Sequence, residues 1–420
     1  MYRLIMHRLL PLFLAGLVVA CAPSSEAPVT VMVLVPKANG VFETQPKKLT
    51  TIENISTLEG SIAHFIGGAR LIWDLSDPNA EETSRPLFKD EGGSVRAQFI
   101  EKNGVLWPAD FHSWAMITAY WNLEQAFLYF DGIYGKQDST ELLDLPVYYW
   151  LDTNVLNPWK KESNTDNAFF YSALFPMMAV LPFKDFQTIP LSINLGIMAH
   201  EYAHLVFNAR VHHSNRFSPV YSHIDDMAMS ILDSINEGLA DFHAFGVTRV
   251  LDKEGMIHFL DWSFGGTAFG KEEPKLRNFT SDNQCMNDVW LNALQQESYV
   301  EFRNSALHYR IGTLFAASFY HAMMLSPGGR DALFDPIVKS IINAYDDETR
   351  GNPGIRQLYS DSLPGAITLE SVANVFLNHI TEEVLRCNTC KQMIGRLALD
   401  PKETTCPATC YPTSDLNICL

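Results

Sequence analysis

Positive charge is scarce in this sequence. Its 420 residues include 31 lysines and arginines against 48 aspartates and glutamates, which gives a formal net charge of −17 at pH 7. Such a chain lacks the basic surface that binds nucleic-acid phosphates, and it lacks a polybasic segment that would hold it on an anionic membrane. We therefore expect no nucleic-acid partner. The charge says little about a substrate.

The sequence also has no internal repeat, no long low-complexity tract and no long apolar run after its first 20 residues. The nearest candidate for a span, from Phe169 to Phe183, is interrupted by Pro176 and Pro182 and predicts buried strands instead. The chain is 47% hydrophobic and 12% aromatic, which is ample for a sizeable core. We expect one large two-lobed unit, or two domains, that folds in water.

The one short apolar run stands at the N-terminus. Two arginines and a histidine precede Leu9 to Ala20, a run too short to span a bilayer and typical of a secretory signal peptide. The run ends in VVAC, which resembles the lipobox of bacterial lipoproteins. That resemblance implies a diacylated Cys21 as the mature N-terminus of an exported protein, anchored by lipid to the bacterial cell envelope. Ala22 follows instead of an aspartate, so we expect the outer membrane. An ordinary signal peptide with an incidental cysteine is the alternative.

Cysteine is missing between Cys21 and Cys285, and five of the remaining six lie in the last 34 residues. An even number of cysteines in an exported protein predicts three disulfides, whose connectivity the sequence leaves open. The spacings in CNTC and CPATC also suit a zinc ribbon, which is the alternative. The six cysteines are Cys285, Cys387, Cys390, Cys406, Cys410 and Cys419.

Strand patterns come first in the chain and helix patterns second. Short strands are predicted over VTVMVLV, over Leu145 to Leu151 and from Ala168 onward, and a long aromatic-rich helix over Phe111 to Tyr134. After Ile193 the pattern is mostly helical. This order predicts an α+β architecture in two lobes. The expected divisions are a signal segment (1–21), a linker and N-terminal segment (22–85), an N-terminal lobe (86–206), a helical lobe (207–385) and a cysteine-rich tail (386–420).

The junction of the two lobes carries GIMAHEYAHLVFN, residues 196–208. His200 and His204 are one helical turn apart on one face, so both imidazoles can bind one metal ion. Glu201 beside them can reach a water molecule on that metal. This is the H-E-x-x-H pattern. A helix with two satisfied histidines is the alternative interpretation.

A second stretch, NEGLADFHA at 236–244, decides between these interpretations. Its carboxylates Glu237 and Asp241 are spaced i and i+4, which stacks two like charges on one helix face and indicates a cation opposite them. A hydrolytic zinc site uses three protein ligands, and two histidines with a glutamate are an established set. Glu237 can be the third ligand. Asp241 can accept the free N–H of a ligand histidine and so orient it.

With these motifs in place, the chain resembles the gluzincin metallopeptidases, specifically the thermolysin-like and fungalysin-like groups. DNAFF at 166–170 is similar to the family's substrate-binding edge strand, and HYRIGTLFAASFY at 308–320 is similar to the segment that carries its oxyanion donor. The helix over 111–134 resembles the long helix of the family's N-terminal lobe. The resemblance covers about residues 90 to 350. It implies a two-lobed thermolysin-like zincin fold with the metal-binding helix between the lobes.

The resemblance also assigns roles. It implies a metalloendopeptidase with one catalytic Zn²⁺ ion, in which Glu201 is the general base and His308 or Tyr309 stabilises the oxyanion. Gly312 matches the family's glycine after the donor histidine. An extended peptide would be held as an added strand by Asn167, Ala168 and Phe169.

Several positions depart from the family pattern. Gly196 stands where thermolysin-like enzymes have a calcium-binding aspartate, so calcium is not supported, and Ala203 replaces the usual threonine. The cysteine-rich tail has no counterpart. Two other functions stay open. A gluzincin aminopeptidase would share the Asn-Glu-Gly motif, although the Gly-x-Met-Glu-Asn signature is missing from the sequence. A non-catalytic, zinc-stabilised binding lipoprotein would not need Glu201.

Overall fold

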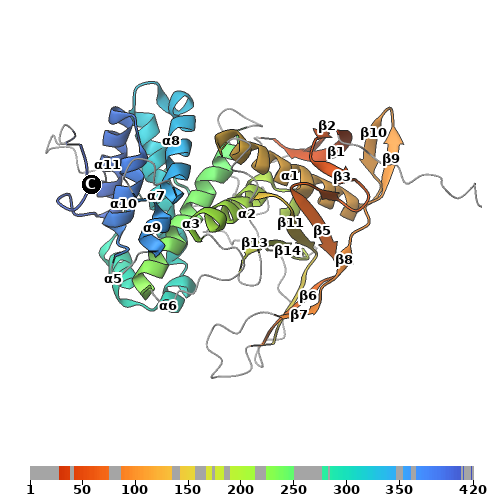
Figure 1. Ribbon diagram of the computed structural model, residues 1–420, viewed down its shortest axis with the longest axis horizontal. Coiled ribbons are helices and arrows are strands. Elements are labelled where there is room, and N and C mark those ends of the chain that lie inside the picture. Colours follow the sequence, from red (N-terminus) through yellow and green to blue (C-terminus); the bar gives the residue numbers. More distant parts are fainter. Residues whose placement is uncertain are drawn as a thin grey trace, which may run out of the picture.

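The structure, a computed structural model, describes residues 28–37, 42–74, 87–134, 142–156, 167–172, 176–183, 190–212, 224–249, 277–281, 284–346, 353–360, 366–407, 410 and 418. Strands fill one end of the molecule and most helices the other (Figure 1). This arrangement confirms the mixed α+β class, with a sheet region first and a helical part second. The predicted signal segment, Cys21 and Cys419 lie outside the described residues.

The described strands form three sheets. One has the order β2-β1-β10-β9, the largest runs β13-β14-β11-β5-β4-β3 with β8 added to β5, and the third is β12-β6-β7. The bounds are β1 Val29–Pro36, β2 Phe42–Leu49, β3 Ile52–Asn54, β4 Glu59–Gly60, β5 Ala63–Gly67, β6 Arg70–Asp74, β7 Leu87–Asp90, β8 Gly93–Ser94, β9 Phe99–Lys102, β10 Val105–Pro108, β11 Leu145–Tyr149, β12 Asp152–Leu156, β13 Ala168–Tyr171 and β14 Met177–Val180. The strands predicted at VTVMVLV, from Leu145 and from Ala168 are therefore present as β1, β11 and β13.

The segment before residue 85 belongs to these sheets. β1 pairs in parallel with β10, with Val31 opposite Leu106, and β5 pairs in parallel with β11, with Ala63 opposite Leu145. A parallel pair needs a long crossover connection, here supplied by the intervening chain. Strands from both sides of the division expected at residue 85 therefore share two of the sheets.

Helices dominate from α2 onward. The predicted helix over 111–134 is present as α1, and the two motif segments lie on α2 and α3. The helical part continues beyond Leu385, so the boundary expected at 386 falls inside α11. The bounds are α1 Phe111–Tyr134, η2 Leu191–Ile193, α2 Leu195–Phe207, η3 Asn208–His212, α3 Asp226–Thr248, α5 Asp288–Gln296, α6 Tyr299–Asn304, α7 Leu307–Leu325, α8 Gly329–Asp346, α9 Ile355–Ser360, α10 Leu369–His379 and α11 Glu383–Leu397.

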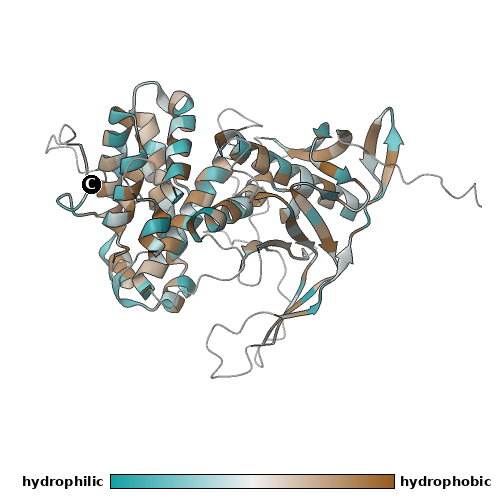
Figure 2. Cartoon of the chain, viewed as in Figure 1, coloured by the Kyte–Doolittle hydropathy of each residue, from teal (hydrophilic) through white to brown (hydrophobic). Residues whose placement is uncertain are grey.

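One hydrophobic core runs through both parts of the molecule and joins buried residues of β1, α1, α2, α3, α7 and α11. Helix α2 lies at its centre, in contact with α1, α3 and β13, and every one of its residues is buried. Hydrophilic and hydrophobic residues alternate along the helices of the helical end (Figure 2), whereas every residue of α2 is buried. Polar groups on α2 are therefore enclosed by protein, and each needs a partner there.

The cysteines of α11 are oxidised. Cys387 bonds to Cys410 and Cys390 to Cys406, and Cys285 is also disulfide-bonded. Two of the three predicted disulfides are thus described, and they contradict the zinc-ribbon alternative for CNTC and CPATC. Among the described residues, no helix is both long and apolar enough to cross a membrane.

Candidate metal centre

Two buried helices supply the candidate centre. The side chain of Asn194 caps α2 by accepting the backbone N–H groups of Gly196 and Ile197, and Asp225 caps α3 by accepting that of Ala228. These caps satisfy N–H groups that the first turn of a helix leaves unpaired. Both motifs therefore sit inside regular helices, where an i, i+4 spacing places side chains on one face.

The predicted ligand atoms converge. His200 Nε2 lies 3.0 Å from His204 Nε2 and 3.2 Å from Glu237 Oε2, and His204 Nε2 lies 3.7 Å from the same Oε2. All three side chains are buried, and together they form a group that could hold a metal ion. Ligand atoms about 2.0 to 2.2 Å from a tetrahedral zinc ion lie roughly 3.3 Å apart, so these spacings fit such an ion.

The outer nitrogens of both imidazoles face oxygen atoms. His200 Nδ1 lies 2.9 Å from Asp241 Oδ1, and His204 Nδ1 lies 2.9 Å from Asn236 Oδ1. Carboxylate and amide oxygens only accept hydrogen bonds, so a neutral His204 carries its proton on Nδ1, and the nearby Asp241 carboxylate favours the same tautomer of His200. The two Nε2 lone pairs then point toward Glu237 Oε2, which accepts no well-formed hydrogen bond. Three acceptors facing one another require a cation or a proton between them.

In this centre, burial and the neighbouring carboxylates act on the pKa values of the two histidines in opposite directions. Burial opposes protonation of His200, yet Asp241 and Glu237 together raise its pKa to about 10. Burial lowers the pKa of His204 to about 4, although Glu237 attracts its proton. Without a metal, a proton on His200 would therefore sit among the three acceptors. A metal ion would displace that proton, as expected for histidine ligands.

Arg277 is a component of the centre that the sequence did not reveal. Its Nε donates to Asp241 Oδ2 at 3.0 Å and its Nη2 to Asp241 Oδ1 at 2.7 Å. The same Nη2 lies 3.7 Å from Glu237 Oε2, and the guanidinium stacks 4.2 Å from the Tyr309 ring centroid. Bidentate pairing fixes the carboxylate that contacts His200. No sequence motif around Arg277 predicts this contact, whereas Asn236 belongs to the Asn-Glu-Gly motif that the sequence shows.

Glu201 contacts the neighbouring sheet. Its Oε2 accepts the backbone N–H of Phe170 in β13 at 2.7 Å. Burial raises the pKa of Glu201 to about 7, while the charge of His200 and the Phe170 N–H act in the opposite direction. The predicted substrate strand therefore does lie beside the motif glutamate.

The predicted strand residues occupy different surroundings. Asn167 is exposed, and its Oδ1 accepts the N–H of Ala168 at 3.0 Å. Ala168 is buried against the main core, while Phe169 packs on the opposite face of the sheet in a second cluster with Tyr148 and Ala179. The Phe169 side chain is thus used in packing, and the strand offers its backbone groups toward Glu201.

His308 and Tyr309 lie in the first turn of α7, close enough to Glu237 for its charge to act on the pKa of both side chains. Burial lowers the pKa of His308 to about 4 against the attraction of Glu237, so its imidazole is neutral at pH 7. Its Nδ1 is buried and forms no hydrogen bond within the described part of the chain. The charge of Glu237 and burial raise the pKa of Tyr309, which keeps its hydroxyl protonated. Both residues can therefore donate a hydrogen bond.

Two glycines allow α3 and α7 to approach this closely. A Cβ atom added at Gly238 would lie 2.0 Å from the carbonyl oxygen of Gly312, and one added at Gly312 would lie 2.3 Å from that of Ser234. The backbones are thus in direct contact, with Glu237 next to one glycine and His308 one turn before the other. This close approach brings residues that are far apart in sequence to the same centre.

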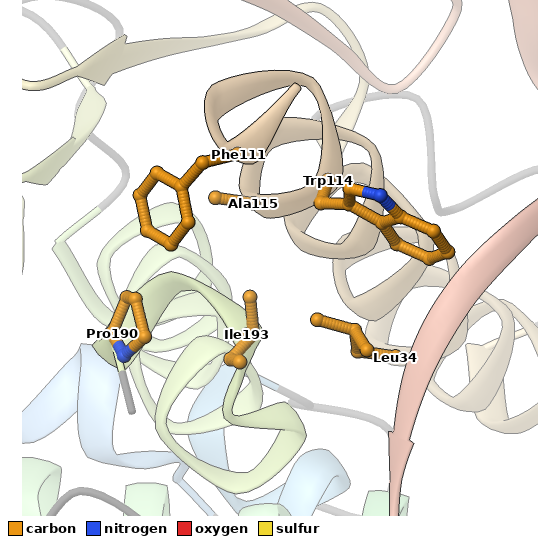
Figure 3. A pocket seen from close by; sticks show the side chains of 6 residues that line it. All are labelled: Leu34, Phe111, Trp114, Ala115, Pro190 and Ile193. Atoms are coloured by element: carbon orange, nitrogen blue, oxygen red, sulfur yellow. The ribbon is translucent and has the colours of Figure 1, made fainter. Parts of the chain in front are cut away.

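A separate apolar pocket of about 270 Å³ lies between the start of α1, β1 and η2 (Figure 3). Its lining contains no charged side chain, and the lining residue Phe111 is half exposed. None of the candidate ligands contributes to it. The lining residues are Leu34, Phe111, Trp114, Ala115, Pro190 and Ile193.

A scan against models of known protein families finds no match for this chain, and a search of curated proteins finds no relative.

Proposed function

We propose that this chain is a zinc-dependent metallopeptidase with a thermolysin-like fold that hydrolyses internal peptide bonds. The main support for this proposal is that His200, His204 and Glu237 converge on one buried point, with Glu201 beside them. A structural zinc site closes all four coordination positions, whereas a catalytic site has three protein ligands and leaves one position open. Three ligands and an adjacent carboxylate support the catalytic alternative over a zinc-stabilised binding protein.

Two histidines and a carboxylate are a donor set that suits zinc. Zinc held by them would lower the pKa of a water molecule and polarise the scissile carbonyl. Asn236 Oδ1 accepts the Nδ1 proton of His204 at 2.9 Å, and Asp241 Oδ1 lies 2.9 Å from His200 Nδ1, where its charge favours a proton on that nitrogen. Arg277 in turn holds Asp241 in place.

The reaction then assigns one task to each remaining group. Glu201 accepts a proton from the attacking water and later delivers it to the leaving nitrogen. His308 or Tyr309 donates a hydrogen bond to the oxyanion, which develops on the scissile carbonyl. The backbone of β13 holds the peptide as an added strand, since no other described strand pairs with its outer edge.

The test is hydrolysis of a denatured protein substrate by the purified chain, with and without a chelator. We expect activity that the chelator abolishes and added zinc restores. Glu201→Gln should retain zinc, because it leaves all three ligands, and should lose nearly all activity. Activity that survives chelation, or full activity in Glu201→Gln, would contradict the proposal. Cleavage that proceeds only from the N-terminal residue would favour an aminopeptidase.

A further inference from the structure

Strand β13 pairs with β14 through alternate residues. The backbone N–H of Leu181 donates to the carbonyl of Asn167 at 2.9 Å, and the register places Phe169 opposite Ala179 and Phe170 opposite Met178. In an antiparallel pair, hydrogen-bonded positions alternate with positions whose backbone groups point away. Asn167 and Phe169 therefore face β14, whereas the N–H groups of Ala168 and Phe170 face the outer edge.

Both outward N–H groups already have acceptors inside the protein. The Asn167 side chain takes the Ala168 N–H at 3.0 Å, and the Glu201 carboxylate takes the Phe170 N–H at 2.7 Å. An edge strand normally presents such groups to an incoming strand. Here a peptide that adds to the edge at Phe170 meets the residue that the proposed reaction uses as its base.

The two contacts compete for one donor. A peptide carbonyl opposite Phe170 needs the same N–H that Glu201 holds, and one N–H makes one good linear hydrogen bond. A carboxylate oxygen engaged with Phe170 offers one lone pair fewer to a proton of the attacking water. The exchange breaks one hydrogen bond and forms another, with no covalent change.

We propose that the Phe170 N–H is a positioning group that holds Glu201 in the resting enzyme and releases it when an extended peptide occupies the outer edge of β13. The substrate class is therefore an extended peptide long enough to place a backbone carbonyl opposite Phe170. This inference rests on the proposed peptidase function. It differs from simple strand binding because the contact with the substrate frees the base and so acts on turnover.

A substrate series tests the release. Peptides with one scissile bond are lengthened by one residue at a time on each side, and kcat and KM are measured for each. We expect kcat to rise on the order of 10-fold at the length that brings a carbonyl to Phe170, because a charge-assisted hydrogen bond is exchanged at that step. Replacing that one carbonyl by a methylene group should remove the rise. If the longer peptide only bound more tightly, with equal stabilisation of the substrate complex and the transition state, KM would fall and kcat would stay unchanged.

Phe170→Pro removes the N–H at a position that gives no hydrogen bond to β14, which an edge strand tolerates. Phe170→Ala is the matched control, because it loses the same side chain and retains the N–H. Zinc content and the circular dichroism spectrum check that both variants fold. We expect the rise in kcat to vanish in Phe170→Pro and to persist in Phe170→Ala.

The possible results distinguish failure of the release mechanism from failure of the proposed function. Chelator-sensitive hydrolysis with the same kcat at every length, or a rise that survives in Phe170→Pro, overturns the release mechanism alone. Absence of chelator-sensitive hydrolysis for every peptide overturns the proposed function and this inference with it.

Discussion

At the scale of single residues, Asp241 serves two neighbours at once. One of its carboxylate oxygens lies 2.9 Å from His200 Nδ1, and both oxygens accept hydrogen bonds from Arg277. Only 2% of Asp241 and 4% of Arg277 is exposed, so neither charge has water as an alternative partner. A buried ion pair contributes little net stability, but removing one member leaves an uncompensated charge. The carboxylate therefore matters to the metal and to the fold.

We predict two losses in Asp241→Asn. Zinc affinity should fall on the order of 10- to 100-fold, since the histidine loses its orienting acceptor. The free energy of unfolding should fall by about 3 kcal/mol, because the buried Arg277 loses the charge of its bidentate partner and only Glu237, 3.7 Å away, remains to offset it. Competition with a chromogenic chelator measures the first effect, and denaturant unfolding of the metal-free protein measures the second.

Asp331→Asn provides the control. Asp331 pairs with Arg249 at 3.3 Å, but 68% of its side chain is exposed. A surface pair of this kind is worth at most about 1 kcal/mol. If Asp241→Asn kept the zinc affinity and the free energy of unfolding of the wild type, Asp241 would contribute no more to either property than a surface ion pair does.

His243 is a buried residue of α3 outside the metal centre. Its Nδ1 lies 3.2 Å from the Tyr129 hydroxyl and its Nε2 lies 3.3 Å from the Tyr345 hydroxyl. Burial lowers its pKa to about 3. In the unfolded chain a histidine has a pKa near 6.5, so only the unfolded state takes up a proton between these values.

We predict that this histidine makes the fold acid-sensitive. Its contribution to stability is fully present above about pH 6.5 and decreases by roughly 1.4 kcal/mol per pH unit as the pH falls toward 3. Denaturant unfolding at pH 8 and at pH 5 gives the free energy of unfolding at each pH. We expect its decrease from pH 8 to pH 5 to be about 2 kcal/mol smaller in His243→Gln than in the wild type. An equal loss in both proteins would mean that His243 is not held neutral.

At the scale of elements, the contact between α3 and α7 decides whether the centre exists. Gly238 and Gly312 bring the two backbones together, and the residue before Gly238 is the carboxylate ligand. Interhelical distance depends on the side chains at the contact. Any Cβ atom at either glycine must push one helix away from the other.

We predict that Gly238→Ala or Gly312→Ala lowers the free energy of unfolding by about 3 kcal/mol and weakens zinc binding, because the helices must separate. Gly132→Ala in α1 is the matched control. A Cβ atom at Gly132 meets nothing within 4 Å, so alanine should raise the stability by about 0.5 to 1 kcal/mol. Denaturant unfolding and zinc titration of the three variants test this. Normal zinc affinity in Gly238→Ala would contradict the role given to the contact.

At the scale of the whole molecule, the sheet region and the helical region share one core, and helix α2 runs through the middle of it (Figure 1). The outer edge of β13 and the ligands of α2 and α3 meet where the two regions join. The disulfides of α11 lie at the far end of the helical region, and α11 packs on α7. The same helix that carries His308 is therefore braced by the cross-linked C-terminal part of the chain.

The N-terminal sequence adds a prediction about location. We expect Cys21→Ser to release the protein from membranes, because acyl chains on the cysteine would be its anchor. Fractionation of cells that express the wild type or the variant, followed by detection of the protein in each fraction, tests this. Equal retention of both proteins in the membrane fraction would rule out a lipid anchor at Cys21.

The sequence by itself determined the candidate ligand set. A helix repeats every 3.6 residues, so His200 and His204 share a face, as do Glu237 and Asp241, before any tertiary contact is known. The long helix over 111–134, the strands near residues 29, 145 and 168, and the oxidised cysteines follow from equally local rules of periodicity and redox chemistry. Each helix face, helix and strand named here depends on residues that are close together along the chain, whereas the meeting of the two helix faces at one centre is a tertiary contact.

Only the tertiary structure decided which distant groups complete the centre. Arg277 reaches Asp241 across 36 positions, and the Phe170 N–H reaches Glu201 across 31, without any local pattern that marks either contact. The membership of residues 22–85 in the sheets and the close approach of Gly238 to Gly312 are likewise contacts between distant segments. The physical reason is that buried polar and backbone groups take whichever partner the packing of whole elements brings within reach.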